Sequence, residues 1–225
     1  MCSTVLVEWR LLSGVPEADV QRVLTSSRRS SYQAGQTIFA EGEPGTALHL
    51  LESGHVAVRV ATATGEVATL TVVAPGEAFG EMALLRRSAL RTATAVALDP
   101  VTTLALESSV FARLRAEYPS VERLLVAVLA ARVSRLSGHL VDALYLPVDK
   151  RLIRRLLELC RVYGEPGATR VVIPLTQEDL AGLAGTTRPT VNSLLRSLQD
   201  AGSIALSRGK VEVLDLPALN AAASA

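Results

Sequence analysis

The sequence has few of the residues that build metal clusters, disulfide frameworks or haem sites. Its 225 residues include two cysteines, Cys2 and Cys160, and three histidines, His49, His55 and His139, all well separated along the chain. Two distant cysteines suggest neither a disulfide framework nor a zinc or iron–sulfur site. An enzyme of the small metal-binding β-barrel type needs clustered histidine and carboxylate ligands, and no HxH pair is present. We therefore expect no metal and no enzyme activity.

Long hydrophobic runs, an excess of one charge and a targeting segment are also missing. Polar or charged residues interrupt every apolar stretch before about 18 residues, which argues against a membrane span. The net charge is +1, so any DNA contact must come from a local surface rather than from a global field. The N-terminus has no basic segment followed by an apolar run, the pattern of a signal peptide. The sequence predicts a cytoplasmic protein without a membrane partner.

The first region, about residues 1–115, has the pattern of an antiparallel sandwich or barrel. Val56, Val58 and Val60 alternate along the chain, as in a strand with one buried face. Residues 16–27 form a short helical segment before the strands. Glycines recur at roughly hairpin spacing, at Gly35, Gly42, Gly45, Gly54, Gly65 and Gly76.

The second region, about residues 116–147, predicts one long helix. Apolar residues follow one another at steps of 3, 4, 3, 4 and 3, the spacing of a coiled-coil seam, at Val126, Leu129, Val133, Leu136, Leu140 and Ala143. The sequence predicts a dimer interface along this seam. A helix packed against its own domain is the alternative, because Leu124, Leu125, Val128 and Val141 widen the apolar stripe. Pro147 interrupts the pattern and indicates a hinge.

The third region, residues 148–225, predicts a winged helix-turn-helix. An amphipathic helix and a short strand, "VVIPL", come first. Thr176 and Asp179 form a capping-box pattern before a helix that stops near Gly185. Thr186 or Thr187 caps a second helix, which Gly202 is placed to end. "IALSRGKVEVL" is a hairpin, and helix, turn, helix and hairpin together are typical of a DNA-binding winged helix.

The stretch Pro75–Ala95 combines Glu81, Arg91 and Thr92 with small apolar residues. After Gly80, a helical turn would present free backbone N–H groups to an anion, and Arg91 can hold two phosphate oxygens. The Glu81 carboxylate would repel phosphate but suits a sugar hydroxyl. These groups fit a nucleotide monophosphate, whereas no Walker motif for a triphosphate is present. A buried Glu81–Arg91 ion pair without ligand is the alternative.

"FGEMALL" followed by "RTATA" resembles the phosphate-binding cassette of cyclic-nucleotide-binding domains. With the long helix and the winged helix-turn-helix, nearly the whole chain resembles the CRP/FNR family of bacterial transcription regulators. The resemblance implies an α+β fold with an antiparallel β-roll (jelly-roll) domain over 1–115, a dimerisation helix and hinge over 116–147, and a DNA-binding domain over 148–225. It also implies a homodimeric regulator of transcription controlled by a cyclic nucleotide.

The resemblance implies that Glu81 holds the ribose 2′-hydroxyl. It also implies that the cyclic phosphate is held by Arg91, Thr92 and the backbone N–H groups near Met82 and Ala83. Two hydroxyl residues that read adenine in cAMP-binding members correspond to Leu136 and Ser137, so the first hydroxyl is missing. Thr92 is also typical of cyclic-GMP sites. The sequence favours cAMP and leaves open cGMP, another small effector or DNA binding without ligand. The implied ligand site comprises Phe79, Gly80, Glu81, Met82, Ala83, Arg91, Thr92, Leu136 and Ser137.

The recognition helix is expected over about 188–201, with Arg188 as the best candidate for a base contact in the major groove. The segment from Thr176 to Lys210 contains four basic and three acidic residues, a local charge of 4 − 3 = +1. The alternative is that the winged helix binds another protein, which is the less frequent use of a winged helix-turn-helix. A dimer would read a palindrome. The predicted DNA-binding residues are Thr176, Gln177, Thr187, Arg188, Pro189, Thr190, Asn192, Ser193, Arg208 and Lys210. The loop Arg161–Arg170 is either an RNA polymerase contact or a plain connector.

Overall fold

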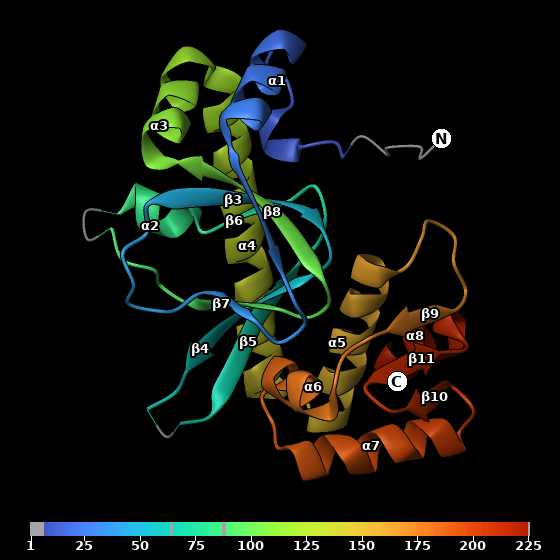
Figure 1. The fold of residues 1–225 in the computed structure, drawn as a ribbon. Helices are drawn as coiled ribbons and strands as arrows, with labels where there is room; N and C mark the ends of the chain where they lie inside the picture. The colour runs from blue at the N-terminus through green and yellow to red at the C-terminus, as the bar shows by residue number, and fades with distance from the viewer. Residues whose placement is uncertain (1–6, 64, 87–88, 225) are drawn as a thin grey trace. The chain divides into compact units, whose positions relative to one another are not determined.

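The chain folds into two compact units, and the computed structural model describes residues 7–63, 65–86 and 89–224. By internal contacts, residues 1–60 and 73–134 form the first unit, and residues 61–72 and 135–225 form the second. The first unit contains most of a β-roll together with five helical segments among the described residues, the last of which continues into the second unit (Figure 1). The second contains the C-terminal helices and a small sheet.

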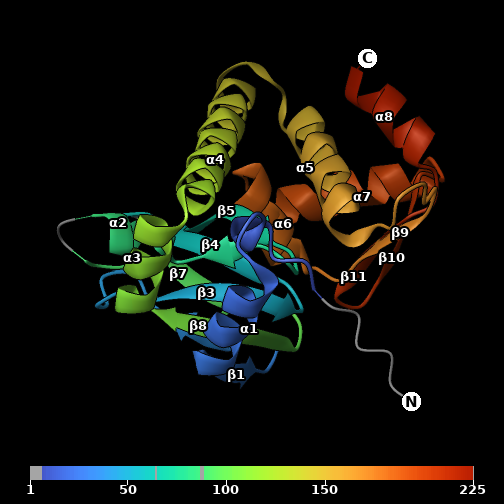
Figure 2. The same cartoon turned by 90° about the horizontal axis from the view of Figure 1, so that it is seen from above.

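The β-roll consists of two four-stranded antiparallel sheets, which appear as separate layers in Figure 2. One sheet has the order β1-β8-β3-β6 and the other β2-β7-β4-β5. Gly54 turns the chain between β3 and β4 with a φ of 79°, and a Cβ there would lie 2.4 Å from the carbonyl oxygen of Pro100. The strands are β1 Arg28–Tyr32, β2 Thr37–Phe39, β3 Ala47–Ser53, β4 Val56–Ala61, β5 Val67–Val73, β6 Ala78–Phe79, β7 Thr94–Ala97 and β8 Val101–Glu107.

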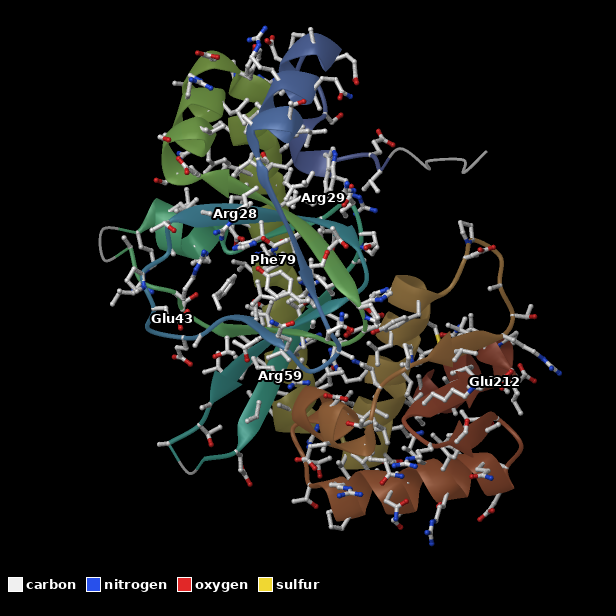
Figure 3. All side chains as sticks on the ribbon, viewed as in Figure 1. Arg28, Arg29, Glu43, Arg59, Phe79 and Glu212 are labelled. Carbon is white, nitrogen blue, oxygen red and sulfur yellow. The ribbon has the colours of Figure 1, made fainter. Side chains whose placement is uncertain are left out.

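Two hydrophobic clusters hold the first unit together. One joins the sheet that contains β3 and β8 to the helical segments η1 (Arg10–Leu12), α1 (Glu17–Ser26), α3 (Ser108–Glu117) and the start of α4. The other fills the inside of the roll, where Leu51, Val56, Phe79, Ala95 and Val101 are buried. Phe79 is the first residue of the cassette, so the start of the cassette is anchored in this second cluster (Figure 3).

The long helix predicted from the apolar seam is α4, Pro119–Tyr145. Several large apolar side chains on this helix remain exposed in the single chain, and they include Val133, Leu136 and Leu140 at 63%, 44% and 60%. By length and composition alone α4 is also apolar enough to cross a membrane, so the sequence argument against a span does not hold for this helix by itself. An exposed apolar stripe of this kind equally suits another copy of the chain.

The second unit has the predicted winged helix-turn-helix. Pro147 precedes α5 (Val148–Tyr163) as its N-cap. Then follow β9 (Val171–Ile173), α6 (Gln177–Ala184), α7 (Arg188–Asp200), the hairpin β10 (Ile204–Ser207) and β11 (Lys210–Val213), and α8 (Leu216–Ser224). The three strands form a sheet of order β10-β11-β9. The α+β fold class expected from the sequence is confirmed.

Polar contacts tie the end of α4 to α5 inside the second unit. Arg155 is 3% exposed and donates to Asp142 of α4 and, at 2.8 Å, to Glu158. Arg151 donates to the carbonyls of Leu146, at 3.2 Å, and of Ala184 and Gly185, at 3.1 and 3.2 Å. One guanidinium therefore connects the segment after α4 to the turn between α6 and α7.

Candidate functional site

The cassette begins with a sharp turn that only glycine accommodates. Gly80 has a φ of 82° and leads from β6 into the short helix α2 (Glu81–Leu85). A Cβ at Gly80 would lie 2.5 Å from Nη1 of Arg91 and 3.3 Å from the ring of Phe39. The first backbone N–H groups of α2, including that of Met82, have no intrahelical acceptor because of their position. The turn thus sets both the direction of α2 and its distance from Arg91.

Arg91 is buried and is held in place on both sides. Its Nη1 donates to the carbonyl of Gly80 at 2.8 Å, and its Nη2 donates to that of Ala47 at 2.9 Å. The guanidinium carbon lies 4.0 Å from the centre of the Phe39 ring, a cation–π arrangement. Its Nε has no hydrogen-bond partner in the described part of the chain. Burial lowers the pKa of Arg91, and the carboxylates of Glu43 and Glu81 oppose that shift.

Glu81 pairs with Arg132 of α4. Its side chain is 3% exposed, and one carboxylate oxygen accepts a hydrogen bond from Nη1 of Arg132. Nη2 of Arg132 donates to the carbonyl of Ala78 at 2.8 Å. The other oxygen, Oε2, is buried without a partner among the described residues. The alternative of a Glu81–Arg91 ion pair is therefore wrong, because Glu81 is bound by Arg132 and the terminal nitrogens of Arg91 bind backbone carbonyls.

The loop between β2 and β3 packs directly against the cassette. Backbone hydrogen bonds join Gly42 N to Arg91 O at 2.9 Å, Arg91 N to Glu43 O at 2.8 Å and Gly45 N to Ala89 O at 2.7 Å. A Cβ at Gly45 would lie 2.2 Å from that of Ala83. Figure 3 labels Glu43 on this loop. The close approach requires glycine at position 45 and keeps Arg91 away from bulk water.

A buried aromatic group supports Phe39 beneath Arg91. His49 stacks on Phe79 with ring centres 5.2 Å apart and lies 5.5 Å from Phe39. Burial, and then the positive charge of Arg91, lower the pKa of His49 to about 4. At neutral pH a neutral imidazole therefore lies close to the cationic Arg91.

The structure brings the cassette residues of the predicted ligand site together. Phe79 through Ala83, Arg91 and Thr92 all belong to the first unit. Leu136 and Ser137 are exposed on α4, in the part of the helix that groups with the second unit. Sequence reasoning missed Arg132, although a charged residue beside the apolar seam was a usable signal. Among the described residues, no group of three or more His, Cys, Asp or Glu could hold a metal ion.

The helix-turn-helix has the predicted caps. The Thr176 hydroxyl accepts from Asp179 N at 3.2 Å, and Oδ2 of Asp179 accepts from Thr176 N at 2.9 Å. Thr187 caps α7, whose first two residues are Arg188 and Pro189, and Gly185 ends α6 with a φ of 61°. These caps fix the turn before α7 and hence the direction in which Arg188 leaves the helix.

A groove of about 500 Å³ lies between the start of α6, α7 and the wing. It brings five predicted DNA-binding residues to one surface, namely Thr176, Gln177, Arg188, Arg208 and Lys210. Thr187, Pro189 and Ser193 are also exposed. Gln177 donates to the Asn192 side-chain carbonyl at 3.1 Å, so Asn192 also joins α6 to α7. Three exposed basic side chains on one groove suit a phosphate backbone.

Two known domain families match this chain, one mainly in the first unit and one in the second. The profile of the cyclic nucleotide-binding domain matches residues 29–118, and that of the Crp-like helix-turn-helix domain matches residues 150–222. A CRP-like cAMP-activated global transcriptional regulator of Mycobacterium tuberculosis is 30% identical over 94% of this chain and 95% of its own. The chain belongs to the CRP/FNR family. It is a DNA-binding transcription regulator with a cyclic nucleotide-binding domain, and not an enzyme.

Further comparisons agree with this CRP/FNR assignment. The chain is 34% identical to the cyclic AMP receptor protein of Thermus thermophilus, over 90% of this chain and 91% of that protein. A solved CRP-family transcriptional regulator from the same organism superposes with a TM-score of 0.73 at 26% identity, covering 87% of this chain and 97% of that one. Both similarities extend through the cassette and the helix-turn-helix.

Proposed function

We propose that this CRP/FNR protein is a cytoplasmic homodimer that binds cAMP and then a palindromic DNA operator. The observation that carries the proposal is a pair of buried polar atoms in the cassette, Oε2 of Glu81 and Nε of Arg91, neither of which has a partner in the described part of the chain. Buried polar groups normally have partners, so an unpartnered acceptor and an unpartnered donor in the same cassette favour a bound ligand.

The two ends of the cassette differ in the chemistry they offer. Arg91 supplies the positive charge for a cyclic phosphate, supported by the hydroxyl of Thr92 and the first N–H groups of α2. Glu81 accepts hydrogen bonds only, so its free oxygen suits a ribose hydroxyl. Arg132, which donates to the other oxygen of Glu81, would hold the carboxylate in position beside that hydroxyl. A cyclic nucleotide has both groups, and the mycobacterial and Thermus relatives are described by their response to cAMP.

The exposed stripe of α4 supports the homodimer. Val133, Leu136 and Leu140 are each at least 44% exposed although they are large and apolar. Val126, Leu129 and Ala143 continue the stripe at coiled-coil spacing. The α4 helix of a second copy would cover these side chains. The two recognition helices of such a dimer would then be related by a two-fold axis. Such symmetry matches a palindrome.

Direct calorimetry with cAMP and with cGMP tests the effector. We expect saturable heat for cAMP, and weaker binding of cGMP. The alternatives that the sequence leaves open are distinct outcomes: stronger binding of cGMP would identify guanine as the preferred base. No heat with either nucleotide at millimolar concentration would show that another effector, or none, controls the protein.

A further inference from the structure

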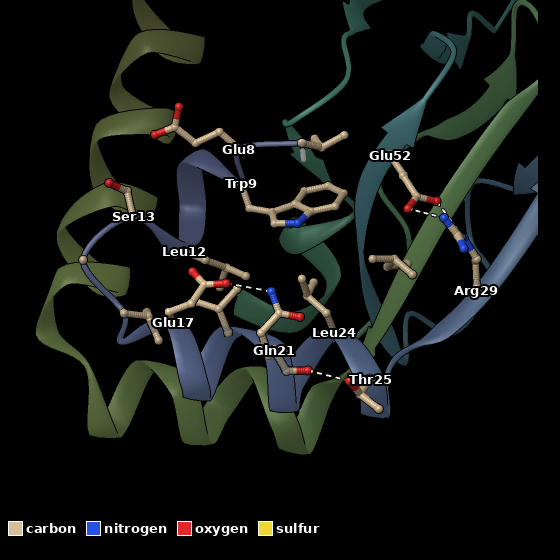
Figure 4. A pocket seen from close by; sticks show the side chains of 15 residues that line it. Glu8, Trp9, Leu12, Ser13, Glu17, Gln21, Leu24, Thr25, Arg29 and Glu52 are labelled. Atoms are coloured by element: carbon tan, nitrogen blue, oxygen red, sulfur yellow. Dashed lines mark hydrogen bonds and ion pairs between the residues drawn. The ribbon is translucent and has the colours of Figure 1, made fainter. Parts of the chain in front are cut away.

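Residues that precede α1, α1 itself and the β1-β8-β3 sheet line an open cavity of about 760 Å³ within the first unit (Figure 4). None of the cassette residues lines it. Its volume falls within the range of roughly 300–1,000 Å³ that is typical of small-molecule sites. The cavity is therefore large enough for a ligand and separate from the nucleotide site.

The floor of this cavity is apolar and belongs to the hydrophobic core. Leu12 and Leu104 are 4% and 8% exposed and belong to the main hydrophobic cluster of the unit, and Leu24 packs against that cluster. An apolar ligand group placed here would cover hydrophobic surface that the fold leaves partly open to water. The floor thus favours a ligand with an apolar body.

Trp9 offers an unused hydrogen-bond donor to the cavity. The residue is 8% exposed, lines the cavity, and its indole N–H has no acceptor in the part of the chain that the structure describes. Figure 4 shows the nitrogen edge of the indole turned inward, toward the side of Gln21. The nitrogen itself is not among the buried atoms without a partner, so it is open to the pocket. It can therefore donate a hydrogen bond to an oxygen acceptor of a ligand.

The charged groups at the rim favour a cation. Glu8, Glu17 and Glu52 line the cavity with a single cation, Arg29, a local charge of 1 − 3 = −2. Nε of Arg29 donates to Oε2 of Glu52 at 2.7 Å, so these two charges offset each other. Gln21 donates to Oε1 of Glu17 at 2.7 Å, which leaves the other oxygen of Glu17 for a ligand. An anion would meet unfavourable potential here.

We infer that this cavity binds a small amine that carries an apolar body and a carbonyl oxygen, the chemistry of an aminoacyl amide. The ammonium group contacts Glu17, the carbonyl oxygen accepts from Trp9, and the apolar side chain lies on Leu12 and Leu104. A free carboxylate on the ligand would be repelled by the excess of acidic groups. The inference does not depend on which nucleotide the cassette binds.

Trp9 also provides the measurement, because it is the single tryptophan of the chain. We would titrate the full-length protein with L-leucinamide near pH 6.5, where the amine is protonated, and follow tryptophan fluorescence. Matched ligands are N-acetyl-L-leucinamide, which lacks the positive charge, and N-acetyl-L-leucine, which is an anion. We expect a saturable change with leucinamide, and at least roughly tenfold weaker binding of the other two.

Glu17→Gln keeps the size of the side chain and removes its charge, and we expect roughly tenfold weaker binding of leucinamide. Glu117→Gln, which changes an exposed glutamate of α3 outside the cavity, should bind like the wild type. Circular dichroism confirms that both variants are folded. No saturable change with leucinamide at roughly millimolar concentration, an equal response to the acetylated ligands, or unchanged binding by Glu17→Gln would each overturn the inference.

Discussion

The Arg91 guanidinium already has two backbone acceptors, so a cyclic phosphate would compete with the carbonyls of Gly80 and Ala47 for its N–H groups. The phosphate is favoured in that competition because it is charged, and bonds between ionised groups are stronger than those to a neutral carbonyl. The stacking on Phe39 remains available in both states. If Arg91 binds the phosphate as proposed, these contacts hold it close to that position before the ligand binds.

Replacing Arg91 with alanine should weaken cAMP binding by roughly tenfold or more, because a charge-assisted hydrogen bond contributes about 1.5–3 kcal/mol. Calorimetry measures the change. Arg86→Ala is the matched control, since it removes an exposed arginine of the same segment that makes none of these contacts. If both variants bind cAMP as the wild type does, Arg91 does not hold the phosphate.

His49 should make stability depend on pH. The folded protein keeps it neutral down to about pH 4, whereas the ordinary pKa is 6.5, so the unfolded chain binds more protons between these values. The contribution of neutral His49 to the free energy of unfolding is complete above pH 6.5. It falls as the pH is lowered toward 4, by at most about 1.4 kcal/mol per pH unit. Urea unfolding at several pH values should show a smaller loss for His49→Phe. Equal pH dependence in both proteins would contradict this.

Arg188 and Lys210 should affect DNA binding in different ways. Arg188→Ala removes the basic residue of the first turn of α7, and we expect a loss of about 1–3 kcal/mol per half-site with a relaxed preference for guanine. Lys210→Ala removes a charge on the wing, so binding to all sequences should weaken alike and the salt dependence should flatten. Selection of sites from random DNA compares the variants. An unchanged motif at unchanged strength for Arg188→Ala would refute the assignment.

At the scale of elements, α4 connects the two functions because it carries Arg132 beside the cassette, the apolar stripe, and Asp142 against α5. The sequence periodicity correctly predicted this helix and its stripe, since a repeat of alternating 3 and 4 residues depends only on local spacing. The caps of α6 and α7 were predicted for the same reason. The Glu81–Arg132 pair was not, because it joins residues 51 positions apart and periodicity carries no information about such a contact.

The contacts that pack the cassette against neighbouring segments could not be predicted from the sequence. Gly42 and Gly45 fall at hairpin spacing in the sequence, but the hydrogen bonds of this loop to Arg91 and Ala89 depend on how β2 and β3 lie relative to the cassette. The buried environment of His49 and its stack with Phe39 and Phe79 likewise follow from three-dimensional packing. The sequence predicts a nucleotide site from Glu81, Arg91 and Thr92, and this stays a prediction, whereas the sequence could not predict the partners that hold Glu81 and Arg91.

The stripe on α4 makes a direct prediction about assembly. The double variant Leu136→Asp, Leu140→Asp would place charges in the seam, where burying them without partners costs several kcal/mol, so it should be monomeric. Analytical ultracentrifugation measures the mass. Ala127→Asp, Ala131→Asp adds the same charges at exposed positions away from the seam and should remain a dimer. A dimeric seam variant would show that the interface lies elsewhere.

At the scale of the whole molecule, the proposal requires a ligand in one unit to change the affinity of the other for DNA. The second unit has contacts that can transmit such a change, because Arg155 bonds Asp142 of α4 and Arg151 bonds both Leu146 and the turn before α7. A shift of the C-terminal end of α4 would therefore move the recognition helix α7. The ligand can favour one arrangement only by its difference in affinity for the two states.

The central claim is that cAMP and DNA binding are coupled in this protein, and one titration tests it most directly. An operator obtained by selection from random DNA, fluorescently labelled, is titrated with protein in the presence and absence of saturating cAMP, and anisotropy gives both affinities. We predict a two-fold palindrome with half-sites about 10–11 base pairs apart that is bound at least roughly fivefold more tightly with cAMP. Equal affinity with and without cAMP would contradict the account.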